Sequence, residues 1–131
     1  MKKVFWGAIV LLFLFSGMAF AETANEAFEK GKEAFLNGDY ITAAKCFRKA
    51  AEQGNAYAQY NLGVMYYEGK GVPQDYVQSY IWLSIAAANL SGDLREQILN
   101  IRDIVAKGLS PKQLEEAQKI ASEWKPKRGT P

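Results

Sequence analysis

The feature that most constrains the fold is an internal repeat of a helical pattern. The pair Asp39-Tyr40 recurs 36 residues later as Asp75-Tyr76, and Ala50-Ala51 recurs at the same spacing as Ala86-Ala87. Apolar residues around these pairs are three and four positions apart, which is typical of amphipathic helices. A repeat of this length, made of two helices, is typical of an α-solenoid, in which each unit packs against its neighbours. The sequence therefore predicts an all-α fold and contains no convincing strand.

Helix start and stop signals divide the chain into six expected helices. Thr23-Ala24-Asn25-Glu26, Asp93-Leu94-Arg95-Glu96 and Ser110-Pro111-Lys112-Gln113 have the spacing of capping boxes. Glycines at 54 and 69 are suited to end helices because glycine readily adopts the left-handed conformation. We expect one domain over residues 22–125, with repeats at about 23–55 and 56–91, a C-terminal pair at 93–124 that acts as a cap, and a flexible tail at 126–131.

Residues 1–21 have the composition of a secretory signal peptide. Lys2 and Lys3 precede an apolar run from Val4 to Phe15, and the segment ends in Ala19-Phe20-Ala21. We expect cleavage after Ala21 and a periplasmic or secreted bacterial protein. An uncleaved membrane anchor is the alternative, although the run is shorter than the roughly 20 residues that span a bilayer. The signal segment is the only expected membrane contact.

The charge of the expected mature chain argues against nucleic-acid binding. The full chain has 16 Lys and Arg against 14 Asp and Glu, and removal of Lys2 and Lys3 with the signal makes residues 22–131 formally neutral. A neutral net charge gives no indication of the basic surface that binds phosphate backbones, and we expect no nucleic-acid partner. Cys46 is the only cysteine, so it has no partner within the chain, and we expect it to be a small buried residue.

One contiguous stretch carries a family resemblance. Residues 58–76 read AQYNLGVMYYEGKGVPQDY, which resembles the signature of the Sel-one-like repeat, a relative of the tetratricopeptide repeat. Residues 37–55 resemble the second half of such a repeat, whereas Lys30-Gly31 replaces the Leu-Gly of the first half and the Gly-x-Gly-Val loop is missing there. The resemblance covers about residues 25–90. It implies a short α-solenoid that serves protein interaction.

The loop Gly69-Lys70-Gly71 raises the alternative of a phosphate-binding loop. A Walker-type loop requires Gly-Lys-Ser/Thr after a strand, and a dinucleotide loop requires a third glycine within a strand–helix unit. Here Gly71 follows Lys70, position 74 is Gln, and the preceding segment is helical. We therefore interpret the stretch as a connection between two helices, in which Pro73 prevents early helix resumption and Asp75 caps the next helix.

Catalytic residue types are scarce in this chain. It contains no histidine, so histidine-based triads and metal sites are excluded, and we expect no cofactor. A paired-carboxylate hydrolase remains an alternative through Glu115 and Glu116, Asp75 or Asp103. Some cysteine-rich secreted members of the Sel-one-like family are linked to β-lactams, but this chain lacks their paired cysteines. We expect no enzyme activity, and a hydrolase that acts on cell wall or β-lactams is kept as the alternative.

The expected binding surface follows from the family resemblance. Tetratricopeptide folds bind partners on the concave surface, which is formed mainly by the first helix of each pair. By that resemblance the candidate partner-binding residues are Phe28, Lys32, Phe35, Tyr60, Asn61, Val64 and Tyr67. Aromatic anchors with a few polar groups are suited to recognition of a protein or peptide. The expected function is a periplasmic or secreted scaffold that binds such a partner, and a membrane-anchored envelope adaptor is a further alternative.

Overall fold

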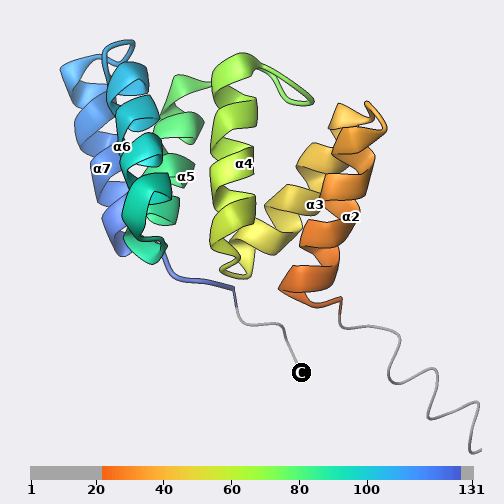
Figure 1. Cartoon of the computed structure of the whole chain (residues 1–131). Coiled ribbons are helices and arrows are strands. Elements are labelled where there is room, and N and C mark those ends of the chain that lie inside the picture. The colour runs from red at the N-terminus through yellow and green to blue at the C-terminus, as the bar shows by residue number, and fades with distance from the viewer. Residues whose placement is uncertain (1–21, 128–131) are drawn as a thin grey trace, which may run out of the picture.

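The computed structural model describes residues 22–127, which form six helices and no strand (Figure 1). The expected signal peptide lies outside the described residues. The six helices are α2 (Ala24–Leu36), α3 (Tyr40–Glu52), α4 (Ala56–Glu68), α5 (Tyr76–Asn89), α6 (Gly92–Ala106) and α7 (Pro111–Glu123). The predicted all-α fold is confirmed, and the helix boundaries lie close to those expected from the start and stop signals.

The first four helices pack as two successive pairs, and α6 and α7 both pack against the second of these pairs. Helix α2 packs against α3, and α3 also contacts α4 of the next pair. Helix α4 packs against α5, which in turn contacts both α6 and α7. Figure 1 shows the helices in this order, with α2 and α3 at one end and α6 and α7 at the other. This arrangement is the predicted short α-solenoid, in which the C-terminal pair covers the exposed side of the second repeat.

Two glycines at matching places allow the helices of each repeat to approach closely. A Cβ atom at Gly31 would lie 2.6 Å from Cδ1 of Phe47, and one at Gly63 would lie 2.8 Å from Cγ of Leu83. Phe47 and Leu83 are almost completely buried. A large side chain from the partner helix therefore occupies the space beside each glycine. This gives the dense packing of a protein interior.

Buried polar side chains join neighbouring helices. The amide of Gln59 donates to the carbonyl of Ala51 at 3.1 Å, and the hydroxyl of Ser79 donates to the carbonyl of Gly63 at 2.7 Å. Both side chains are fully buried. Because a buried polar group without a partner costs free energy, these two bonds favour one register between α3 and α4 and between α4 and α5.

Of the three capping boxes expected from the sequence, one is complete, one is formed in part and one is absent. The box at Ser110 is complete, because Ser110 Oγ accepts from Gln113 and the Gln113 side chain accepts from Ser110. At Thr23 the hydroxyl accepts from the backbone of Glu26 at 3.1 Å. The expected box at Asp93 is wrong. Helix α6 begins at Gly92, with positive φ, and Asp93 lies inside the first turn rather than at the cap.

Residues 68–75 form the connection between α4 and α5 and also contact the first repeat. Gly69 has φ +68° and ends α4 in the left-handed conformation. A Cβ atom at Gly71 would lie 2.1 Å from the carbonyl oxygen of Tyr40. The ammonium of Lys70 lies 4.7 Å from the centre of the Tyr40 ring and 5.8 Å from that of Phe35. The loop therefore follows a helix, as expected, and its lysine contacts aromatic rings of the preceding repeat.

Two other expectations concern Cys46 and the tail. Cys46 is only half-buried in α3, so the expectation of a buried thiol is wrong; its neighbour Phe47 is the residue that enters the core. At the start of the expected tail, the backbone N–H of Lys127 donates to the carbonyl of Glu52 at 2.7 Å, and its ammonium pairs with the Glu52 carboxylate at 3.2 Å. The segment after α7 thus returns to the end of α3.

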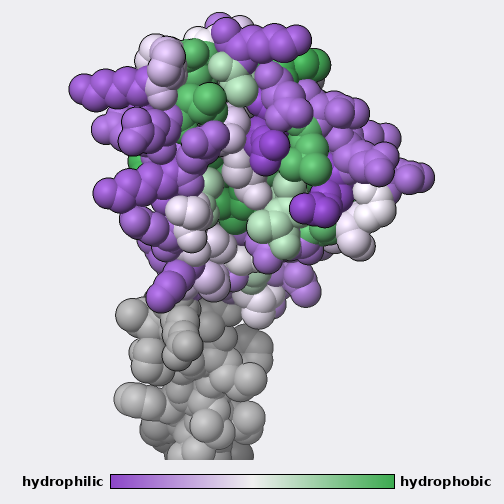
Figure 2. All heavy atoms as spheres, turned by 90° about the vertical axis from the view of Figure 1, so that its left-hand side faces the viewer, coloured by the Kyte–Doolittle hydropathy of each residue, from purple (hydrophilic) through white to green (hydrophobic). Residues whose placement is uncertain are grey.

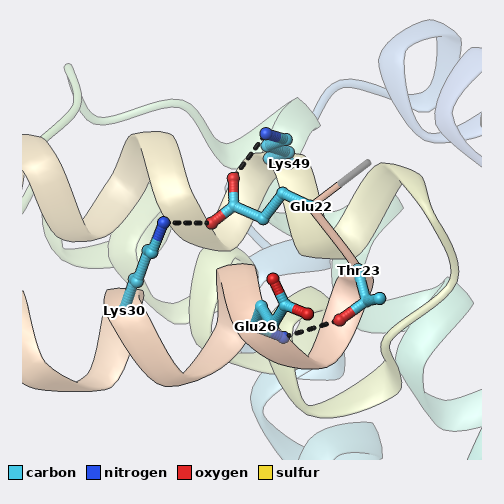
Figure 3. A network of polar contacts seen from close by, with 5 residues as sticks. All are labelled: Glu22, Thr23, Glu26, Lys30 and Lys49. Carbon is cyan, nitrogen blue, oxygen red and sulfur yellow. Dashed lines mark hydrogen bonds and ion pairs between the residues drawn. The ribbon is translucent and has the colours of Figure 1, made fainter. Parts of the chain in front are cut away.

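Glu22 joins the two helices of the first repeat. Its carboxylate pairs with Lys30 of α2 at 3.0 Å and with Lys49 of α3 (Figure 3). The hydrogen bond from Lys49, followed by that from Lys30, lowers the pKa of Glu22. The same ion pair raises the pKa of Lys30. The network lies at the N-terminus of the described chain and holds that end of α2 against α3.

The Glu22 network predicts a component of the acid sensitivity of folding. Because folding lowers the pKa of Glu22, its stabilisation is present above the unfolded pKa of about 4.3 and is lost as pH falls through the lower folded value. We expect Glu22→Gln to reduce the loss of unfolding free energy between about pH 5 and pH 3. Urea titrations at both pH values measure this, with Glu29→Gln as a control of equal charge change; an equal effect of both variants contradicts the role of Glu22.

Candidate partner-binding groove

A groove runs between α2 and α4, the first helices of the two repeats. Its volume is about 320 Å³, within the range typical of ligand pockets. Most of the lining surface is apolar, and the polar side chains lie among apolar ones. The lining residues are Lys32, Phe35, Leu36, Phe47, Tyr60, Asn61, Val64, Met65 and Glu68. The groove therefore has the composition of a surface that receives apolar side chains and fixes them with a few polar contacts.

The structure brings together five of the seven residues expected from the sequence. These five, Lys32, Phe35, Tyr60, Asn61 and Val64, line the groove. Phe28 instead packs against Phe47 and Tyr57, with ring centres 5.8 and 6.2 Å apart. Tyr67 stacks on Tyr76 at 5.7 Å. Phe28 and Tyr67 are half-buried and lie outside the groove. The geometry of the groove therefore does not support their expected role in partner binding.

Four lining residues were missed by the sequence reasoning. Phe47 and Met65 are each 2 % exposed and form the buried floor, whereas Leu36 is 83 % exposed at the rim. Glu68 is the fourth. The position of Leu36 at the end of the first helix, one residue after Phe35, was a usable signal. Phe47 could not be found from repeat position, because it reaches the groove from the second helix of its pair.

The charged residues of the groove are paired on the surface. The ammonium of Lys32 lies 3.2 Å from the Glu29 carboxylate and 5.3 Å from the centre of the Phe28 ring. On α4, the Glu68 carboxylate lies 4.0 Å from the Lys70 ammonium. Exposed pairs of this kind contribute little free energy, typically about 0–1 kcal/mol. The apolar lining is therefore the main source of binding energy that the groove offers.

The candidate catalytic groups do not meet in this groove. Glu115 and Glu116 are exposed on α7 and line no part of it. Ser122 and Lys125 have the Ser-x-x-Lys spacing, which the sequence reasoning overlooked. However, the Ser122 hydroxyl donates to the Lys119 carbonyl at 2.8 Å, and the chain leaves the helix at Trp124 before Lys125. Across residues 22–127, no cluster of three His, Cys, Asp or Glu residues is arranged to hold a metal ion.

Comparison with known families identifies the repeat. A family model described as "Sel1 repeat" matches residues 21–55 and 56–89, which together are more than half of the chain. The chain belongs to the Sel1 repeat family. The resemblance stated from residues 58–76 is therefore confirmed, and the less regular first unit is matched as well. The Sel1 repeats place the α2–α4 groove on the first helices of two adjacent repeats.

A solved structure supports the same fold. The chain is similar to c5321, described as a protective antigen present in uropathogenic Escherichia coli strains and displaying an SLR fold. The TM-score is 0.67 at 38% sequence identity, and the match covers 77% of this chain and 22% of the other. The part of this chain that matches the solved structure is longer than the two repeats together. The structural likeness therefore extends beyond the residues that the family model matches.

Curated relatives share a shorter segment. The chain is 44% identical over 45 residues to the DAP3-binding cell death enhancer 1 of Rattus norvegicus and to that of Mus musculus. The match covers 34% of this chain and only 9% of each relative. The chain thus spans about a tenth of the curated relatives it matches, and the shared part is the size of a single repeat with its flanks.

The surface at the C-terminal end differs from the groove. Figure 2 shows the side formed by α6 and α7, where hydrophilic side chains cover most of the surface and hydrophobic ones form separate patches. Ile104 and Ile120 are about half exposed there. A mainly polar outer face is typical of the end of a solenoid. None of the helices within residues 22–127 has both the length and the apolar character needed to cross a membrane.

Proposed function

We propose that this Sel1 repeat protein is a periplasmic or secreted scaffold that holds a segment of a partner protein in the α2–α4 groove, without catalysis of its own. One observation carries the proposal. Phe35 and Leu36 remain 37 % and 83 % exposed beside the buried floor of Phe47 and Met65. Exposed apolar residues next to a pocket with an apolar floor are typical of surfaces that bind another protein.

The chemistry of the groove favours a peptide segment with a large apolar side chain. Such a side chain would contact Tyr60 and Val64 on α4 and cover the floor. Asn61 is the lining amide, and amide side chains can donate to and accept from a peptide backbone. The occupant is therefore a segment of a partner protein, with its apolar anchor in the groove and its backbone at Asn61.

Site-specific photo-cross-linking in the native envelope tests this proposal. A photoreactive residue at position 36, at the groove rim, is compared with one at position 41, where Ile41 is also exposed, at 63 %, but lies outside the groove. We expect a defined cross-linked product from position 36 only, and we expect Val64→Asp to abolish it. Equal products from both positions, or a product that persists with Val64→Asp, would overturn the proposed site.

The location of the protein is tested separately. Mass measurement of the N-terminus in a bacterial envelope fraction distinguishes the cleaved form, which starts at Glu22, from a membrane-anchored adaptor that keeps residues 1–21. Activity on peptidoglycan fragments or β-lactams that disappears with Glu115→Gln or Glu116→Gln would instead favour the hydrolase. Because both residues are distant in sequence from the groove, this result is independent of the cross-linking experiment.

A further inference from the structure

A second pocket lies among α5, α6 and α7 and shares no residue with the α2–α4 groove. Its volume is about 260 Å³, slightly below the range typical of drug-sized ligands. The lining residues are Tyr80, Ser84, Ala88, Arg102, Gln118, Ala121 and Ser122. Helix α5 supplies three of them at intervals of four, so they form one stripe along that helix. The pocket therefore has room for a small ligand rather than for a length of peptide.

The electrostatic character of the pocket comes from Arg102. It is the only charged residue among those that line the pocket. One nitrogen of its guanidinium donates to Asp103 at 3.2 Å, and the group lies 5.7 Å from the centre of the Tyr80 ring. Asp103 is 65 % exposed, and an exposed pair of adjacent residues neutralises the cation only weakly. The pocket therefore offers one positive charge.

Two hydrogen-bonding groups in this pocket have no partner among the described residues. Arg102 Nε and Ser84 Oγ are both shielded from solvent, and neither has a hydrogen-bond partner within residues 22–127. The Tyr80 oxygen accepts from Gln118 Nε2 at 3.4 Å, which leaves the phenolic O–H free to donate. Shielded donors without acceptors cost free energy in the empty pocket. An oxyanion would supply the missing acceptors.

We propose that this pocket binds a small monoanionic carboxylate. A carboxylate accepts hydrogen bonds at both oxygens and matches the planar guanidinium of Arg102. The hydroxyl of Tyr80 is the second donor, and Ala88 and Ala121 provide an apolar wall for the remainder of the ligand. A single cation suits one negative charge better than the two of a phosphate. Because Arg102 Nε is shielded, binding includes a rotation of the Arg102 side chain that gives this N–H an acceptor.

An NMR titration of the purified chain tests the proposal. The probes are sodium butyrate, the uncharged butyramide, sodium chloride, and N-acetyl-alanyl-alanine as a peptide C-terminus. We expect butyrate to saturate with a Kd of roughly millimolar magnitude and to shift the Nε–H signal of Arg102. Butyramide and chloride should leave that signal in place. Saturation by the dipeptide as well as butyrate assigns the source to peptide C-termini, whereas saturation by butyrate alone assigns it to small acids.

Three variants separate binding from folding. Arg102→Gln should weaken butyrate binding about tenfold or more, and Tyr80→Phe, which keeps the ring, about threefold. Lys107→Gln removes the same charge from the end of α6 outside the pocket and should change the Kd less than twofold. Retained helical circular dichroism shows that each variant is folded. Absence of saturation by either carboxylate, or equal Kd values for wild type, Arg102→Gln and Tyr80→Phe, overturns the proposal.

Discussion

Gly71→Ala is expected to destabilise the fold more than any other alanine substitution in the loop between α4 and α5. Gly71 has φ +74°, a conformation that costs a residue with a Cβ atom about 1–2 kcal/mol. The added Cβ would also lie 2.1 Å from the Tyr40 carbonyl oxygen, which is backbone and cannot rotate away. The two effects together predict a loss of about 3–4 kcal/mol, a large part of a typical stability of 5–15 kcal/mol.

Gly38→Ala is the matched control for this prediction. Gly38 has φ +78°, but a Cβ there would meet no atom within 4 Å. It should therefore show the conformational cost alone, about 1–2 kcal/mol. Urea unfolding followed by circular dichroism measures both variants. Equal losses for Gly71→Ala and Gly38→Ala would show that the contact between the loop and Tyr40 does not contribute.

Removal of the C-terminal helix pair is expected to abolish cooperative folding. The edge-to-face pair of Trp82 and Trp124, with ring centres 6.2 Å apart, would be lost together with the buried side chains of Ile98 and Val105. Each large apolar side chain contributes about 1.5–3 kcal/mol when buried. Exposure of α5 therefore removes most of a typical domain's stability. The truncated chain 22–92 should be unstable or should aggregate.

A chain of residues 22–127 is the control for the truncation. It keeps α6, α7 and the contact between Lys127 and Glu52. Thermal melts and size-exclusion chromatography compare both chains with the full mature chain. We expect residues 22–127 to melt at the same temperature as the mature chain. A cooperative melt of residues 22–92 at nearly that temperature would contradict the proposal that the C-terminal pair stabilises the repeats as a cap.

The fold could be predicted from the sequence because its signals are local. Ser110, Pro111 and Gln113 specify the start of α7 within four residues, and Gly69 specifies the end of α4 by its left-handed conformation. The expectation at Asp93 was wrong because α6 begins at Gly92, which places Asp93 in the first turn and leaves Ser91 at the cap without a side-chain hydrogen bond.

The groove was only partly predictable because it depends on side chains that meet in three dimensions. Repeat position indicated the correct helices, and hence Tyr60, Asn61 and Val64. It could not show that Tyr67 stacks on Tyr76 or that Phe28 packs on Phe47. Likewise, the pocket at Arg102 is formed by three helices, and no sequence pattern links Arg102 to Ser84 and Gln118.

The affinity for a captured partner segment tests the central account most directly. The segment cross-linked at position 36 is synthesised, and its Kd is measured by calorimetry for wild type, Tyr60→Ala and Tyr67→Ala. Tyr60 lines the groove, whereas Tyr67 is a half-buried tyrosine of the same helix outside it. We predict a loss of about tenfold or more for Tyr60→Ala and less than about threefold for Tyr67→Ala. Unchanged affinity for Tyr60→Ala, or equal losses for both, would contradict binding in the α2–α4 groove.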